Sequence, residues 1–174
     1  EGDDEFKGVE MKRSSVAPVV KKVQREIFAA ILDGKSKIEI IGIIKSLNGE
    51  LLDAEQTPDI DFGRPHGLRS SNESTQQAKA AKWSNQNMGT TFELGDKPVL
   101  FIASMGPAPL PKGGVIAIPY GENPADWRIS VNREASIRKY FADSASMQAI
   151  LAAVGVKWDD ALQGVLRADF EGFF

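Results

Sequence analysis

The chain has 174 residues, of which 42% are hydrophobic and 26% are charged, as expected for one globular domain, alone or with appendages. It contains no cysteine and a single histidine, which excludes disulfides, thiolate chemistry and a multi-histidine metal site. No apolar run approaches the roughly 18 residues of a membrane span and no signal peptide opens the chain, so we expect no membrane partner. The net charge of −3 does not by itself argue for or against nucleic acid.

The first third of the chain has the apolar spacing of two helices. Ser14 or Ser15 is expected to cap the first helix, with Pro18 tolerated in its first turn and Gly34 just beyond its end. The second helix is predicted over residues 38–51, although its internal glycines weaken the prediction. The apolar residues of the first helix lie three and four positions apart and are Val16, Val19, Val20, Val23, Ile27 and Ile31.

The remaining two thirds alternate between loops and short elements. Residues 52–74 are predicted to be a loop because proline and glycine recur there. Two β-type runs flank a Pro-rich segment over residues 106–111, and we expect them to form a hairpin. The fold class predicted is therefore α+β, helix-rich with a small antiparallel β element. The later elements are expected at residues 75–83 (helix), 98–104 and 115–119 (strands), and 133–141, 147–154 and 159–166 (helices).

Positive charge is concentrated in two segments. Residues 7–25 hold six bases and one acid, and residues 64–82 hold four bases and one acid. A phosphate backbone is bound by local positive surface, so these segments are candidates for a nucleic-acid contact. For Lys21, Lys22 and Arg25 the alternative is the solvated face of an amphipathic helix. Bases and hydroxyls at a helix start, as over residues 7–15, are better suited to a phosphate.

The sequence shows no motif of a catalytic centre. Residues 106–114 lack the order of a phosphate-binding loop, and there is neither a nucleophile elbow nor a zinc-protease motif. Asp59 and Asp61 form a D-x-D pair that could bind a divalent cation, but they lie in a polar loop. His66 is expected to be a hydrogen-bonding loop residue. No acid–base pair can be assigned from the residues alone.

Residues 6–15, FKGVEMKRSS, followed by an amphipathic helix, resemble the start of the thumb of a family B DNA polymerase, closest to the T-even-like bacteriophage replicative enzymes. Later segments resemble thumb landmarks in the same order. These are residues 65–69 (PHGLR), 78–83 (AKAAKW), 95–101 (GDKPVLF) and 115–119 (VIAIP), and then an aromatic C-terminus. The resemblance spans nearly the whole chain and rests on the order of short motifs. The helical region before Pro58 is shorter than in many relatives.

The resemblance implies a thumb-like duplex-DNA-binding domain over residues 1–168 and a clamp-binding tail over residues 169–174. It implies contacts to the sugar–phosphate backbone of primer–template DNA, without readout of its sequence. The DNA-binding residues implied are Lys7, Lys12, Arg13, Ser14, Ser15, His66, Arg69 and Lys79. The residues implied to bind a sliding clamp, from an exposed tail, are Leu166, Phe170, Phe173 and Phe174.

The same resemblance places the catalytic palm outside this chain. The partner chain would carry palm, fingers and exonuclease, and its palm carboxylates would hold two Mg ions, with no cofactor or metal in this chain. We expect a subunit of a split polymerase, a processed piece or an excised domain, located in the cytoplasm (of the host cell if viral). Two alternatives remain: a non-catalytic protein-interaction module of a phage or bacterial assembly, and a small hydrolase using Asp59, Asp61 and His66.

Overall fold

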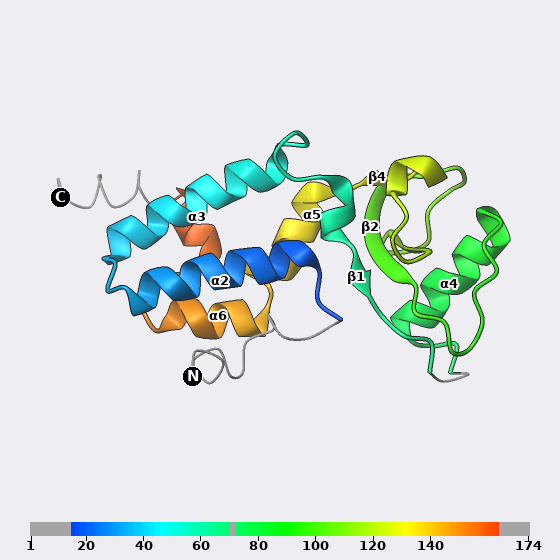
Figure 1. The fold of residues 1–174 in the computed structure, drawn as a ribbon, viewed down its shortest axis with the longest axis horizontal. Helices are drawn as coiled ribbons and strands as arrows, with labels where there is room; N and C mark the ends of the chain where they lie inside the picture. The colour runs from blue at the N-terminus through cyan, green and yellow to red at the C-terminus, as the bar shows by residue number, and fades with distance from the viewer. Residues whose placement is uncertain (1–14, 70–71, 164–174) are drawn as a thin grey trace. The chain divides into compact units, whose positions relative to one another are not determined.

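The computed structural model describes residues 15–69 and 72–163, which form two units (Figure 1). We call residues 19–56 and 137–163 the helical unit, and residues 15–18 and 57–136 the mixed unit. The chain crosses from one to the other at the start of the first helix, after residue 56, and within α5. Each unit has its own core and is described separately. Within the described ranges, no helix is long and apolar enough to cross a membrane.

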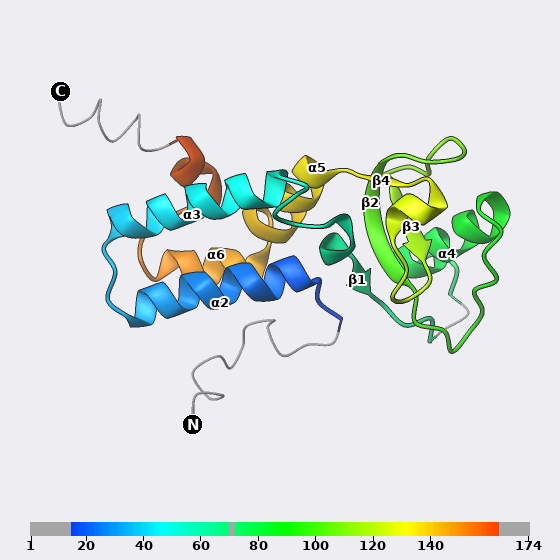
Figure 2. The same ribbon diagram turned by 45° about the horizontal axis from the view of Figure 1, so that its top comes forward.

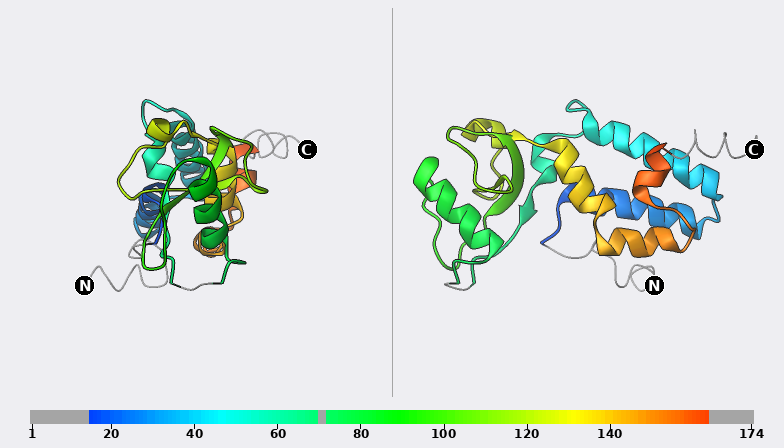
Figure 3. Two further views of the ribbon diagram at one scale, coloured as in Figure 1. Left: turned by 90° about the vertical axis from the view of Figure 1, so that its right-hand side faces the viewer. Right: turned by 180° about the vertical axis from the view of Figure 1, so that it is seen from behind.

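The helical unit is built from α2 (Pro18–Leu32), α3 (Lys37–Leu52) and α6 (Ala145–Ala152), with a π-helical turn η4 (Arg138–Ala142) before α6. Residues 158–163 are also helical. Figures 2 and 3 show α3 and α6 lying alongside α2. One apolar stripe from each helix meets in the core, whose largest fully buried side chains are Ile27, Ile40, Ile44, Leu51, Phe141, Met147 and Leu151.

Local sequence explains where these helices start and stop. α2 begins at Pro18. Proline is tolerated at this position because the N–H of a first-turn residue makes no hydrogen bond within the helix. Gly34 follows α2 with a φ of 76°, a conformation that favours glycine. Ser36 caps α3: its Oγ accepts a hydrogen bond from Glu39 N at 3.2 Å, and Glu39 Oε1 accepts one from Ser36 N at 3.2 Å.

Polar contacts also join the helices of this unit. Gln24 is fully buried, and its Nε2 donates a hydrogen bond to Ser146 Oγ at 3.1 Å, which links α2 to α6. Lys22 Nζ pairs with Glu50 Oε2 at 3.1 Å across α2 and α3. Phe141 stacks on Trp158 with ring centroids 4.9 Å apart. The Gln24–Ser146 bond thus ties α6 to α2, and the Phe141–Trp158 stack joins η4 to the helical residues 158–163.

The mixed unit has a small antiparallel sheet. Its strands are β1 (Arg64–Pro65), β2 (Val99–Met105), β3 (Val115–Ile118) and β4 (Ser130–Val131). β2 is central: it pairs with β1 and β3, and the end of β2 pairs with β4 after a register shift near Ala103. The helical elements of this unit are η2 (Asp59–Phe62), α4 (Gln76–Asn87), η3 (Pro124–Trp127) and α5 (Arg133–Ile137).

α4 packs on the sheet through small residues. Ala80 and Ala81 are buried in one cluster with Leu68, Leu100 and Ala117. Ser84 on α4 is also buried, and its Oγ accepts a hydrogen bond from Ala117 N at 3.0 Å. That bond satisfies a backbone N–H that would otherwise lose its partner on leaving water. Small side chains thus let the helix approach the strand closely.

Gly63, just before β1, is required by a close approach of the backbone to β2. A Cβ at this position would lie 2.4 Å from Val99 Cγ1 and 2.5 Å from Phe101 Cζ. Both neighbours are buried, so neither can easily move away. The close contact at Gly63 fixes the position of β1, and of the residues after it, against β2.

The predicted α+β class with a small antiparallel β element is confirmed, and so is the hairpin of β2 and β3. Two local predictions were wrong. Ser15 lies in a turn before α2 and does not cap it, since the helix begins only at Pro18. The predicted loop over residues 52–74 contains η2 and β1, because β2 supplies hydrogen-bond partners from far along the chain. The predicted exposed C-terminal tail lies outside the described residues.

Candidate functional site

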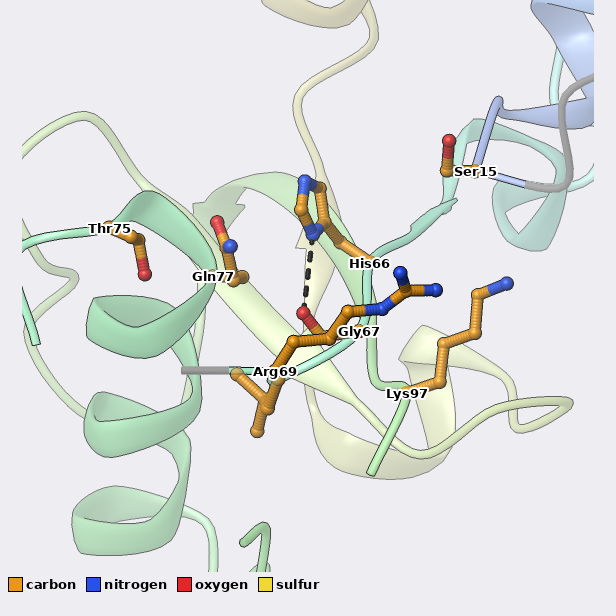
Figure 4. Close-up of a pocket in the computed structure, with 8 residues that line it drawn as sticks. Ser15, His66, Gly67, Arg69, Thr75, Gln77 and Lys97 are labelled. Atoms are coloured by element: carbon orange, nitrogen blue, oxygen red, sulfur yellow. Dashed lines mark hydrogen bonds between the residues drawn. The ribbon is translucent and has the colours of Figure 1, made fainter. Parts of the chain in front are cut away.

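A basic pocket of about 330 Å³ lies in the mixed unit (Figure 4). It is lined by Ser15, His66, Gly67, Leu68, Arg69, Thr75, Gln77 and Lys97. Two of these side chains are cationic, a third is the imidazole of His66, and none of the described lining residues is acidic. Four of the others bring hydroxyl, amide or backbone groups. The pocket therefore presents donors and positive charge, a composition suited to an anionic group.

The backbone that carries His66 and Arg69 is held beside the segment that carries Lys97. His66 N donates a hydrogen bond to Pro98 O at 2.9 Å, and Leu68 N donates one to Asp96 O at 2.8 Å. Gly95 N in turn donates to Leu68 O at 2.8 Å. These bonds continue the pairing of β1 and β2 past the ends of the strands, and they bring two basic segments together that are about 30 residues apart in sequence.

The buried side chain of Leu68 fixes residues 66–69 to the core of the mixed unit. It is 6% exposed and belongs to the cluster that α4 forms with the sheet. Its neighbour Arg69 is exposed, as expected when successive side chains of an extended segment point to opposite faces. In Figure 4 the guanidinium of Arg69 and the ammonium of Lys97 extend toward the same side of the pocket. The His66 ring lies near them, with Nδ1 3.5 Å from Gly67 O.

The N-terminal end of α4 forms another side of the pocket. Thr75 is the N-cap: its Oγ1 accepts a hydrogen bond from Ala78 N at 3.3 Å and donates one to Asn72 O at 3.2 Å. The first turn of α4 carries no acidic residue. The partial positive charge of this helix end therefore adds to that of the pocket's basic side chains.

The structure brings together three of the predicted DNA-binding residues, Ser15, His66 and Arg69, because all three line this pocket. Lys79 lies exposed on α4 and does not line it. The other predicted residues lie outside the described part of the chain: Lys7, Lys12, Arg13 and Ser14 for DNA, and Leu166, Phe170, Phe173 and Phe174 for the clamp. Whether any of these residues binds DNA or a clamp stays a prediction.

Lys97, Thr75 and Gln77 line the pocket but are not among the predicted site residues. Lys97 stands inside the segment GDKPVLF, which the resemblance identifies as a thumb landmark without assigning Lys97 a role. Antiparallel pairing of residues 64–65 with β2 places the residues just before β2 near residues 66–69. Only the register of β1 on β2 makes that neighbourhood visible.

The D-x-D pair has a structural partner in the mixed unit. Arg133 donates from Nη2 to Asp59 Oδ1 at 2.6 Å and to Thr57 O at 2.7 Å. The Arg133 side chain is 12% exposed, and its guanidinium lies 4.9 Å from the centroid of the Phe62 ring. Asp59 thus serves a part-buried ion pair that ties η2 to α5. Among the residues described, no group of three or more histidines, aspartates or glutamates is placed to hold a metal ion.

Comparison with known proteins adds no relative from which a role could be transferred. No protein-family model matches the chain, and no curated protein matches it.

Proposed function

We propose that this chain binds the sugar–phosphate backbone of primer–template DNA, as the thumb portion or subunit of a replicative DNA-directed DNA polymerase. The observation that carries the proposal is the basic pocket, where His66, Arg69 and Lys97 surround a space free of acids among its described lining residues. Guanidinium, ammonium and hydroxyl groups are the usual partners of phosphate oxygens. The order of thumb-like motifs along the sequence points to a polymerase among the many proteins that bind phosphate.

The size of the pocket favours a backbone group over a large ligand. A volume of about 330 Å³ lies at the lower end of the range for small-molecule sites. Contacts of this type position a duplex and carry no sequence information, which is what a replicative enzyme requires of the surface behind its catalytic centre.

Two parts of the proposal rest on the sequence alone. The tail over residues 169–174, with Leu166 before it, would dock into a sliding clamp through its phenylalanines, because buried aromatic anchors dominate the binding energy of such contacts. The partner chain would supply the palm, the fingers, the exonuclease and two Mg ions. Deletion of residues 169–174 should abolish clamp-dependent processivity while leaving extension of short primers by the assembled polymerase.

The proposal is tested by titrating the chain with labelled primer–template duplex over a salt series. We expect weak binding at physiological salt, with a Kd of about 10⁻⁴ to 10⁻⁶ M for duplexes of unrelated sequence, weakening steeply as salt rises. Arg69→Ala, which removes a base from the pocket, should weaken this binding. Lys22→Ala is its matched control, because Lys22 is paired with Glu50 in the helical unit. Absence of binding at low salt, or binding that is insensitive to salt, would contradict the proposal and favour the protein-interaction module.

A further inference from the structure

A second pocket, of about 460 Å³, also lies in the mixed unit and shares Lys97 with the basic pocket. It is lined by Gly89, Thr90, Thr91, Phe92, Asp96, Lys97, Pro119, Tyr120, Glu122 and Trp127. We call it the aromatic pocket, because three of its side chains are aromatic. It has no part in the function proposed above. Its chemistry differs from that of the basic pocket, although the two meet at one lysine.

One of the three aromatic side chains of this pocket is largely exposed, and the other two are partly exposed. Tyr120 is 72% exposed, one of the most exposed large hydrophobic side chains among the described residues. Trp127 is half-buried, and its Nε1 donates a hydrogen bond to Glu122 Oε1 at 3.0 Å, which fixes the edge of the indole. Phe92 is also half-buried and packs against the α4–sheet cluster. The pocket thus offers aromatic surface that the fold itself does not cover.

The two acids of the aromatic pocket already hold N–H donors. Asp96 Oδ2 accepts a hydrogen bond from Glu93 N at 2.9 Å, and Glu122 accepts the one from Trp127. They still disfavour a phosphate within this pocket, in contrast to the basic pocket. A ligand that fits both pockets therefore carries its negative charge on the Lys97 side and presents neutral flat groups to Tyr120 and Trp127.

Single-stranded nucleic acid has this alternation of charged phosphates and neutral bases. Proteins that bind it combine a basic surface, which follows the backbone, with aromatic side chains on which bases stack. We propose that the aromatic pocket stacks unpaired nucleotides of the strand that continues from a duplex held at the basic pocket. This inference rests on the proposed function, because the basic pocket supplies the duplex contact. It extends the substrate from a duplex to the junction of a duplex with a single strand.

The inference is tested by comparing a blunt duplex with the same duplex carrying a single-stranded overhang of about ten nucleotides. We expect the full chain to bind the tailed duplex about tenfold more tightly than the blunt one, since stacking of one base accounts for about that factor. Tyr120→Ala should remove this gain and leave the affinity for the blunt duplex unchanged, and its high exposure makes the substitution tolerable to the fold. Tyr120→Phe keeps the ring and should keep the gain.

Leu94→Ala is the matched control, because Leu94 is an exposed apolar residue of the same unit, 60% exposed, that lines neither pocket. Equal affinity for blunt and tailed duplexes would overturn the inference and leave the duplex-binding proposal standing. Absence of binding to either would overturn both. Saturable binding of a proline-rich peptide that Tyr120→Ala abolishes, without any gain from the overhang, would overturn the inference in favour of a peptide groove.

Discussion

The helical unit and the mixed unit use the same kinds of charged residues in different ways. In the described residues of each unit, basic and acidic side chains are equal in number. In the helical unit, bases on the surface lie against acids: Lys22 against Glu50, Lys35 against Glu39, and Arg138 against Asp159. The mixed unit also pairs bases with acids, Arg133 with Asp59 and Lys82 with Glu73, but it has in addition a pocket lined by His66, Arg69 and Lys97. The net charge of a unit therefore does not predict what it binds, whereas the positions of its charged side chains indicate a candidate site.

The two units close their cores in a similar way. Each buries large side chains with no exposed surface, such as Phe141 in the helical unit and Phe62 in the mixed unit, and each holds a hydrogen-bonded polar residue inside, Gln24 or Ser84. The mixed unit has a short sheet whose loops carry both pockets. A rigid scaffold with ligand groups on its loops is the usual division of labour in binding proteins. Both proposed binding sites lie in the mixed unit.

The largest effect expected is from Phe141→Ala. Removal of this fully buried ring, which stacks on Trp158, should lower the free energy of unfolding of the helical unit by about 4 kcal/mol. Amide hydrogen exchange resolves the two units, and protection should fall in α3 but persist in β2. Equal loss of protection in both would show that the units unfold as one, and would break the comparison.

Arg133→Ala should act in the mixed unit with a somewhat smaller effect. It leaves Asp59 without its partner in a part-buried site, which we expect to cost about 3 kcal/mol in the free energy of unfolding. Arg138→Ala is the control, since Arg138 is 57% exposed and pairs with an exposed Asp159, a contact worth under about 1 kcal/mol. Hydrogen exchange measures both losses, from the β2 amides in Arg133→Ala and from the α3 amides in Arg138→Ala. Similar losses for the two variants would contradict the assigned difference in burial.

Arg69→Ala tests the charge arrangement directly. It should lower affinity for all duplex sequences alike, by about tenfold, and reduce the slope of log K against log salt by about one. Lys35→Ala, which removes an exposed lysine of the helical unit near Asp33 and Glu39, should change neither quantity. Anisotropy titrations at several salt concentrations measure both. If the two variants behave alike, the pocket is not distinguished from ordinary charged surface.

Ser36→Ala should cost the helical unit about 1 kcal/mol, because it removes the side-chain acceptor of the α3 capping box. Thr75→Ala makes the equivalent change at the N-cap of α4 in the mixed unit. Thermal or urea unfolding with hydrogen exchange measures both losses. Because Thr75 also lines the basic pocket, its variant alone should in addition weaken DNA binding. Unchanged affinity in both variants would remove Thr75 from the binding surface.

The smallest effect concerns pH. The hydrogen bond from the backbone N–H of Ser36 lowers the pKa of Glu39 below its usual value, with further lowering from the Ser36 hydroxyl and from Lys35. A carboxyl with a depressed folded-state pKa stabilises the fold above its unfolded-state pKa, and this contribution disappears as pH falls through the folded-state value. Glu39→Gln removes the titrating carboxyl, so the stability of the helical unit should no longer contain this pH-dependent contribution. Identical acid unfolding curves for the two proteins would contradict it.

Some of the fold could be predicted because its causes are local. The apolar stripe of α2 and the Gly34 that follows it are legible within a few neighbouring residues, and the β2–β3 hairpin has a clear β-type composition. β1 and β4, each of two residues, could not be predicted, since only pairing with β2 makes them strands. The capping box of Ser36 and Glu39 was present in the sequence and was overlooked.

The residues of the candidate site likewise fall into those that local sequence predicts and those that depend on contacts between distant segments. Residue type and short-range spacing are enough to predict the α+β class, the long helices and the positive character of residues 64–82. Only the folded chain shows that Lys97 joins His66 and Arg69, that Asp59 is paired with Arg133, and that Tyr120 stands exposed beside Trp127. Those neighbourhoods depend on strand register and on contacts between distant segments, and an extended strand can satisfy its backbone hydrogen bonds with more than one partner until the whole core selects one.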